Sequence, residues 1–192
     1  MSTHDDLRAI ALAEFSAAGY AGTSLQRIAE LAGLSKSSVL YHFASKEALL
    51  EAAIAPAIDA IAQVLGSMAA ASQSAESRKL FIADFVDCML GFRLEMHIFI
   101  NQSRALVDIP VIDRANGIIS GIADYFTTQG FSLEQKMRFG VALGGAAYTL
   151  AVGSDFDGTD AEEPAAELRA ALITVMTELL DPVPVNQPAR QE

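Results

Sequence analysis

The sequence contains one cysteine, no tryptophan and only three histidines in 192 residues. A single cysteine, Cys88, excludes an intramolecular disulfide and is typical of a reducing compartment. Its apolar neighbours predict a buried structural thiol, with a redox-sensing thiol as the alternative. The histidines at 4, 42 and 97 lack the spacing of metal ligands, and no nucleophile is paired with a base. We therefore predict no metal, no cofactor and no enzymatic activity.

Long hydrophobic runs are also scarce. The longest extends from Phe139 to Gly153, which is shorter than the roughly 20 apolar residues that a membrane-spanning helix needs. The chain does not open with a basic segment followed by an apolar one and a small-residue cleavage site. We therefore expect a soluble, cytoplasmic protein.

Basic residues are few, and the net charge is −11. The excess of acidic over basic residues is unevenly distributed. Residues 1–50 carry four Lys/Arg and five Asp/Glu, whereas the remaining residues carry nine Lys/Arg and nineteen Asp/Glu. Acidic charge after residue 50 repels nucleic acid from everything except the N-terminal segment. So few cations per chain provide little non-specific affinity for DNA, and tight binding is therefore expected to need two subunits.

Alternating strand-like patterns are rare, so the predicted fold class is all-α, with about nine helices. A first domain is predicted over 1–50, a second over 51–182, and a proline-rich disordered tail over 183–192. We expect the helix that begins at Lys46 to kink or restart at Pro56. Further helices are predicted over 78–91, 93–106, 110–130, 132–153 and 161–180.

Residues 23–49 predict two short helices and the start of a third. The spacing of Thr23 and Gln26 is that of a capping box, and Ser35 and Ser45 are suitable N-caps for the next two helices. Gly33 is placed to end the first of these helices with a positive φ. A helix over about 5–18, ended by Gly19, supports the pair. This arrangement indicates a helix-turn-helix.

The helix after Ser35 has two different faces. One is predicted to pack inward through Val39, Leu40 and Phe43. The other carries hydrogen-bonding groups without a carboxylate, which suits a surface in the DNA major groove: Ser37, Ser38, Tyr41 and His42. Lys36 and Lys46 are predicted to anchor phosphates, Lys46 because it lies at a helix N-terminus, where the helix dipole favours an anion.

Residues 7–49 resemble the N-terminal domain of tetracycline-repressor-type (TetR family) regulators in the order and spacing of AAGYAGTS, IAELAGLS, SSVLYHF and SKEAL. Family members commonly carry a phosphate-contacting tyrosine where this chain has Leu40, so Tyr41 either takes over that contact or reads a base. The resemblance implies a DNA-binding helical domain followed by a ligand-binding and dimerisation domain. The predicted DNA contacts are Thr23, Ser24, Arg27, Lys36, Ser37, Ser38, Tyr41, His42 and Lys46.

Two features of the second domain bear on mechanism. The small residues of GVALGGAAYTLAVG predict close approach of another helix. With the last helix they are expected to form a dimer interface, although packing within one subunit is the alternative. Aromatic, methionine and polar side chains predict an apolar ligand cavity with polar anchors, and plain core is the alternative. Its predicted contacts are Phe85, Met89, Phe92, His97, Asn101, Arg104, Tyr125 and Tyr148.

The predicted function is therefore a ligand-responsive regulator of transcription, more specifically a dimeric repressor that a small-molecule inducer releases from a palindromic double-stranded DNA operator. The alternative is an all-α small-molecule-binding protein, or an enzyme on this scaffold, whose DNA-reading face is vestigial. The sequence does not identify the inducer, the operator or the regulated genes.

Overall fold

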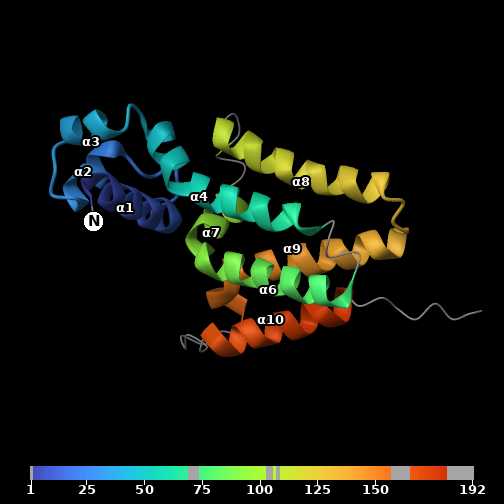
Figure 1. Cartoon of the computed structure of the whole chain (residues 1–192). Helices are drawn as coiled ribbons and strands as arrows, with labels where there is room; N and C mark the ends of the chain where they lie inside the picture. The colour runs from blue at the N-terminus through green and yellow to red at the C-terminus, as the bar shows by residue number, and fades with distance from the viewer. Residues whose placement is uncertain (1, 69–73, 103–105, 107–108, 157–164, 181–192) are drawn as a thin grey trace, which may run out of the picture.

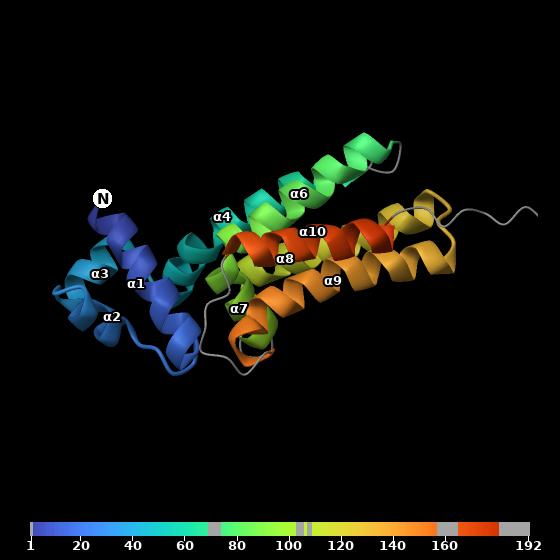
Figure 2. The same ribbon diagram turned by 90° about the horizontal axis from the view of Figure 1, so that it is seen from below.

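The computed structural model describes residues 2–68, 74–102, 106, 109–156 and 165–180, with only the backbone given for 152–156 and 165. The described residues form helices and no strands, which confirms the all-α class. In chain order the helices are α1 (Thr3–Ala18), α2 (Leu25–Leu31), α3 (Lys36–His42), α4 (Lys46–Gly66), α6 (Ala75–Gly91), α7 (Arg93–Gln102), α8 (Pro110–Thr128), α9 (Leu133–Phe156) and α10 (Ala165–Leu180). Helices α1 to α3 lie at one end of the molecule, and α6, α8, α9 and α10 extend away from them (Figures 1 and 2).

The first three helices begin and end where local chemistry predicts. Gly19 and Gly33 have φ values of 78° and 66°, so glycine is needed after α1 and α2. Ser35 accepts a hydrogen bond from Ser38 N, and Ser45 accepts one from Ala48 N, which confirms both predicted caps. Helix α1 begins two residues earlier than predicted because Ser2 and Asp5 form a capping box.

One predicted cap is wrong. Helix α2 is capped by Ser24, whose Oγ accepts a hydrogen bond from Arg27 N at 3.1 Å, and not by a Thr23–Gln26 capping box. The Thr23 side chain is only 3% exposed and points back toward α1. Because Thr23 and Ser24 are adjacent hydroxyl residues, the sequence allowed either of them to cap α2. In the structure Ser24 is the cap, and Thr23 occupies the buried position before it.

Helix α4 passes through Pro56 without a restart, contrary to one of the two outcomes expected there. It is long and apolar enough, by length and composition only, to span a membrane. Its contacts with α1, α6, α7 and α8 explain that composition, because a helix surrounded by other helices is apolar on several faces. Helix α4 therefore connects the two ends of the molecule.

The second half has its own core between α6, α8, α9 and α10, which includes Phe81, Phe85, Met89, Phe139 and Met176. Ser132 and Gln135 form a capping box at the start of α9, with hydrogen bonds of 2.8 and 3.2 Å. Leu80 of α6 is 58% exposed and does not belong to this core. Helix α9 continues to Phe156, three residues beyond the predicted end at Gly153.

The first core does not stop at residue 50. It joins side chains of α1 to α4 with Ile98, Leu106, Ile109, Val111, Ile112 and Ala115. Helices α7 and α8 therefore pack directly against the N-terminal helices, with α7 contacting α1 and α8 contacting α4. A change in α7 or α8 is mechanically connected to the orientation of the N-terminal three-helix unit.

Candidate nucleic-acid interface and ligand cavity

The outward face of α3 is polar and open. Tyr41 is 87% exposed, and Ser37 and His42 are exposed beside it, so the predicted outward orientation of these three side chains is confirmed. They line a shallow depression with Thr3 and Leu34. Ser38 is half-buried, and its Oγ lies 2.8 Å from Ser35 Oγ, so its hydroxyl is partly committed to the helix start.

Ring contacts support the aromatic side chains on this face. The Tyr41 and His42 rings pack edge to face with centroids 5.4 Å apart, and His4 of α1 lies 4.5 Å from the buried Phe43. His4 and His42 lie 6.5 Å apart, so α1 and α3 together form the exposed surface. No carboxylate lines the depression, which leaves hydrogen-bond donors and acceptors for a polyanionic partner.

Leu40 does not pack inward as predicted. It is 41% exposed, whereas Val39 is fully buried and Phe43 is 4% exposed. Leu40 follows the fully buried Val39 directly, and helical periodicity alone does not decide whether such a neighbouring position is buried or exposed. The exposed surface of α3 therefore includes one large apolar side chain beside Tyr41.

Lys36 and Lys46 differ in what they contact. Lys36 is exposed and has no ionic or hydrogen-bond partner among the described residues. The Lys46 Nζ donates to the carbonyl oxygens of Tyr20 at 2.9 Å and Thr23 at 3.0 Å, and it lies 4.2 Å from the centre of the Tyr20 ring. Protein carbonyls satisfy this ammonium, which favours a structural role for Lys46 over the predicted phosphate anchor.

Tyr20 extends this buried network. Its hydroxyl donates to Glu47 Oε1 at 2.9 Å, and burial together with that carboxylate raises the pKa of Tyr20 well above its usual range. The pKa of Glu47 is lowered by hydrogen bonds from its own backbone N–H, Ser45 and Tyr20. The start of α4 is thereby tied to the loop between α1 and α2.

Two other predicted contacts also serve the fold. The Thr23 Oγ1 lies 2.8 Å from the carbonyl oxygen of Gly19 and 3.2 Å from that of Glu14, so its buried hydroxyl is already hydrogen-bonded, which favours a structural role over the predicted DNA contact. Arg27 pairs with Glu14 through its Nε at 3.4 Å, and its side chain remains 55% exposed. Ser24 is exposed at the start of α2.

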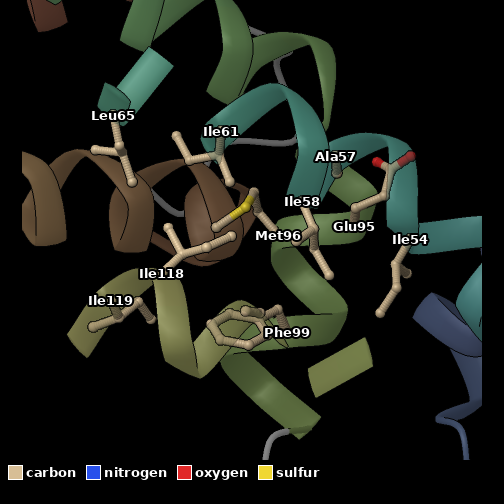
Figure 3. Close-up of a pocket in the computed structure, with 11 residues that line it drawn as sticks. Ile54, Ala57, Ile58, Ile61, Leu65, Glu95, Met96, Phe99, Ile118 and Ile119 are labelled. Atoms are coloured by element: carbon tan, nitrogen blue, oxygen red, sulfur yellow. The ribbon is translucent and has the colours of Figure 1, made fainter. Parts of the chain in front are cut away.

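A separate apolar cavity of about 80 Å³ lies between α4, α7 and α8 (Figure 3). Its walls are Ile54, Ala57, Ile58, Ile61 and Leu65 from α4, Glu95, Met96 and Phe99 from α7, and Ala115, Ile118 and Ile119 from α8. Glu95 is the one charged side chain in this lining. Burial raises its pKa, and the Arg8 guanidinium of α1 partly opposes that increase.

The far end of α7 is clamped to the N-terminal unit. The Gln102 Oε1 accepts a hydrogen bond from Tyr20 N at 2.6 Å, and its Nε2 donates to the carbonyl oxygen of Phe15 at 2.7 Å. These bonds connect α7 with the C-terminal end of α1 and the loop that follows it. The helix that lines the cavity with Glu95, Met96 and Phe99 is thus joined to the unit that carries α3.

Comparison with known proteins identifies the N-terminal unit. Residues 7–53 match the family described as bacterial regulatory proteins, tetR family. Over 49 residues the chain is 53% identical to the HTH-type transcriptional regulator RutR of Escherichia coli K12, across 26% of this chain and 23% of RutR. The chain carries the N-terminal domain of the TetR family. The match spans less than a quarter of RutR, so it does not extend the properties of the rest of RutR to this chain.

Solved structures of regulators share the fold of nearly the whole chain. The ketosteroid transcriptional regulator KstR2 of Mycobacterium tuberculosis has a TM-score of 0.67 at 15% identity over 92% of this chain and 94% of its own. A TetR-family regulator from Bordetella parapertussis 12822 has a TM-score of 0.68 at 17% identity over 94% and 95%. At these identities the likeness establishes the fold alone.

In this TetR-like fold the cavity lies away from the predicted ligand contacts. Phe85 and Met89 are buried in the second core, and Tyr125 packs on Phe126 and Phe131 with ring centroids 5.8 and 6.0 Å away. Phe92 ends α6 and also lies outside the lining. None of these four residues lines the α4–α7–α8 cavity. Their role as ligand contacts stays a prediction, and burial in the second core favours the alternative of plain core for Phe85 and Met89.

The polar stripe of α7 likewise faces a neighbouring helix. His97 Nδ1 lies 2.8 Å from the carbonyl oxygen of Ala151 and 3.0 Å from Asn101 Nδ2, so these side chains connect α7 with α9 outside the cavity. Arg104 lies outside the described residues. The sequence signal that could have indicated this cavity is the apolar spacing of Ile54, Ile58, Ile61 and Leu65 along the helix that begins at Lys46.

Helix α9 has an outward face that its own subunit leaves uncovered. Val141 is 59% exposed and Tyr148 is 53% exposed, so Tyr148 points away from the predicted ligand site. Among the described residues, no neighbouring atom lies within 4 Å of a Cβ added at Gly140, Gly144 or Gly145. Ala146 and Met176, which were expected at the dimer interface, are instead buried in the second core. Packing within one subunit thus explains the small residue at Ala146, but it does not explain the glycines at 140, 144 and 145.

Proposed function

We propose that this protein is a ligand-responsive, DNA-binding regulator of transcription, specifically a homodimeric cytoplasmic repressor. The observation that carries the proposal is the face of α3, where exposed Ser37, Tyr41 and His42 project without an accompanying carboxylate. A short, firmly capped helix of this kind fits the major groove, where its side chains meet base edges.

The roles on this face divide by contact. Tyr41 and Ser37 read base edges, while Lys36 binds phosphate because its ammonium has no described partner within the protein. Ser24 and Arg27 lie exposed at the start of α2, where backbone N–H groups also favour a phosphate. Lys46 and Thr23 keep α2 and α4 in register with α1 and make no contact with DNA.

The dimer in this proposal forms through the outward face of α9 and α10, defined by Gly140, Val141, Gly144, Gly145, Tyr148 and Val175. Glycine weakens a helix by about 0.5 to 1 kcal/mol relative to alanine, and no described residue packs against the Cβ positions of these three glycines. Close approach of a second copy supplies that packing. Two subunits also double the cations at the DNA and place two α3 helices about 34 to 36 Å apart for successive major grooves.

The ligand in this proposal occupies the α4–α7–α8 cavity. Binding there acts on DNA only if the ligand prefers one arrangement of α4 and α7 over another. Helix α4 leads directly into the N-terminal domain, and α7 is clamped to it by Gln102. An inducer that shifts these helices alters the spacing of the two α3 helices and releases the operator.

The proposal is tested by fluorescence anisotropy of the full-length protein with DNA from upstream of its own gene and with a scrambled duplex, at two salt concentrations. We expect tighter binding to the upstream DNA. We also expect Tyr41→Ala to weaken that binding by about 1 to 3 kcal/mol while changing the scrambled duplex little. A uniform loss on both duplexes would assign Tyr41 to phosphate.

Equal affinity for the two duplexes, or no binding to either, would reject the regulator. The remaining interpretation would then be a small-molecule-binding protein, or an enzyme on this scaffold, with a vestigial α3 face. A ligand that enters the cavity without changing DNA affinity would support the same conclusion.

A further inference from the structure

The α4–α7–α8 cavity is lined by hydrocarbon almost throughout. Ten of its eleven lining side chains are apolar, and Figure 3 shows the carboxyl group of the eleventh, Glu95, turned away from the others. An ordered water needs about two to four polar partners inside a protein, and these lining side chains direct none into the space. An ion is excluded more strongly, because an unpaired charge beside hydrocarbon loses its hydration. The wall therefore favours a neutral apolar occupant over water or an ion.

The size of the cavity and its position near the surface limit the shape of that occupant. Its volume is about 80 Å³, whereas an apolar cavity that takes up benzene measures about 150 Å³. One lining residue, Ile119 of α8, is 53% exposed, so this wall of the cavity borders solvent. A narrow hydrocarbon chain suits these dimensions, with one end enclosed and the other directed past Ile119 toward water.

The cavity lies where the two hydrophobic cores meet. Ile54 and Ala115 belong to the first core, which also contains side chains of α1 to α3. Ile61 and Met96 line the same cavity and pack against the second core. A group that fills this space therefore adds apolar contacts to both cores at once.

We propose that the cavity binds a short, unbranched hydrocarbon chain, the apolar part of a neutral ligand, and holds it by apolar contact without an ionic anchor. The inference rests on the proposed function, since it names the chemical class of that regulator's ligand. Filling the junction of the two cores changes how the N-terminal helices pack against α7 and α8, because close-packed side chains transmit such a change. The ligand acts on DNA to the extent that the filled junction holds α3 differently from the unfilled one.

A series of straight-chain alcohols from 1-butanol to 1-octanol tests the apolar site. Binding is followed by NMR of the full-length protein labelled with ¹³C at its methionine methyl groups. Met96 lines the cavity, whereas Met137 is 57% exposed on α9 and serves as the internal control. We expect the Met96 signal, assigned with Met96→Leu, to shift while the Met137 signal does not. The affinity should rise about fourfold for each added methylene, which corresponds to about 0.8 kcal/mol, and level off once the chain fills the cavity.

Three probes of equal chain length separate apolar contact from an ionic anchor: 1-hexanol, hexylamine and hexanoate. We expect both ions to bind about fourfold or more weakly than 1-hexanol, because a charged group that stays in water withdraws at least one methylene from the cavity. The sign of the charge should make little difference. Glu95→Gln is expected to leave these preferences unchanged, since the carboxyl group is turned away from the other lining side chains.

A cavity-filling substitution assigns binding to this site. Ala115 is 8% exposed and lines the cavity from α8, so Ala115→Leu places hydrocarbon where the ligand chain would lie. We expect this variant to lose the shift of the Met96 signal with 1-hexanol, and its DNA affinity without alcohol to equal that of the unmodified protein saturated with 1-hexanol. Ala123→Leu makes the same change at an exposed position of α8 and is expected to alter neither property, since leucine and alanine have similar helix propensities. Circular dichroism verifies that both variants are folded.

The inference is overturned if no alcohol shifts the Met96 signal, if affinity is independent of chain length, or if either ion binds more tightly than 1-hexanol. A folded Ala115→Leu variant that still binds 1-hexanol has the same consequence. The alcohol series uses the unmodified protein and does not depend on any variant. Discrimination between upstream and scrambled DNA is measured without alcohol, so failure of the alcohols to bind, with intact operator recognition, leaves the proposed regulator standing. Alcohol binding by a protein that ignores its upstream DNA would do the reverse.

Discussion

The opposite environments of Lys36 and Lys46 predict different outcomes for the same substitution. Lys46→Met retains the aliphatic stem and removes the ammonium that donates to the Tyr20 and Thr23 carbonyl oxygens. Lys36→Met makes the same chemical change on the exposed face of α3. The pair therefore separates a lysine that stabilises the fold from one that contacts DNA.

The expected loss of folding stability in Lys46→Met follows from the contacts of the Lys46 ammonium. Hydrogen bonds to a charged group contribute about 1.5 to 3 kcal/mol each, and the cation over the Tyr20 ring adds about 0.5 to 1 kcal/mol. The site is only partly buried, and the exposed carbonyls regain some water, so we expect a net loss of about 2 to 3 kcal/mol. For a chain of this size that corresponds to a decrease in Tm of about 4 to 12 °C.

The assay is urea and thermal unfolding of both variants followed by circular dichroism, together with DNA anisotropy over a range of salt. Lys36→Met is expected to change stability by less than about 0.5 kcal/mol, to weaken binding to all DNA sequences, and to reduce the salt slope by about one. Unchanged stability of Lys46→Met, combined with a smaller salt slope, would refute the structural role and restore Lys46 as a phosphate contact.

Three further predictions concern the dimer, the clamp and the cavity. Val141→Glu places a charge on the outward face of α9; we expect sedimentation to show monomers and DNA affinity to fall at least tenfold, and an intact dimer would exclude this face. Gln102→Ala removes two hydrogen bonds, and we expect a loss of about 1 to 3 kcal/mol in urea unfolding with weakened inducer response. Burial raises the pKa of Glu95 in the folded state, so its contribution to stability is complete below pH 4.5 and is lost as pH rises through the folded pKa. Glu95→Gln does not titrate, so its stability relative to the unmodified protein should increase above pH 4.5; a difference independent of pH would contradict the burial of this carboxyl.

Much of the N-terminal unit could be predicted from the sequence because its determinants are local. A cap such as Ser35 or Ser45, and a glycine such as Gly33 with its positive φ, act within four residues of where they lie. The exposed face of α3 could be predicted once these helix ends were known, because the helical period then determines which side chains share a face. The structural contacts of Lys46 and Thr23 were not predicted, because the Lys46 ammonium binds the carbonyl oxygens of Tyr20 and Thr23 from 26 and 23 residues away and the Thr23 hydroxyl also reaches Glu14, nine residues back. A local pattern does not reveal such partners.

The cavity was harder to predict for the same physical reason. Phe85 and Met89 have the composition of a ligand site, but composition does not determine which helices meet, and α9 and α10 cover them in the fold. Ile58 and Ile61 have the composition of ordinary core and line the cavity because side chains of α4, α7 and α8 leave a space between these helices there. A void depends on the placement of whole helices, whereas a helix end depends on a few neighbouring residues.

The continuity of the first core determines how such a void can act on DNA. If the boundary near residue 50 also divided the packing, a ligand signal would have to pass through α4 alone. Instead Ile98 and Ile112 share one core with Leu7 and Ile28, and Gln102 fixes the end of α7 to α1. A displacement of α7 relative to α8 cannot be absorbed at a flexible joint, because close-packed side chains transmit strain. The N-terminal domain must therefore move as a unit with the wall of the cavity, which makes the position of α3 sensitive to what the cavity contains.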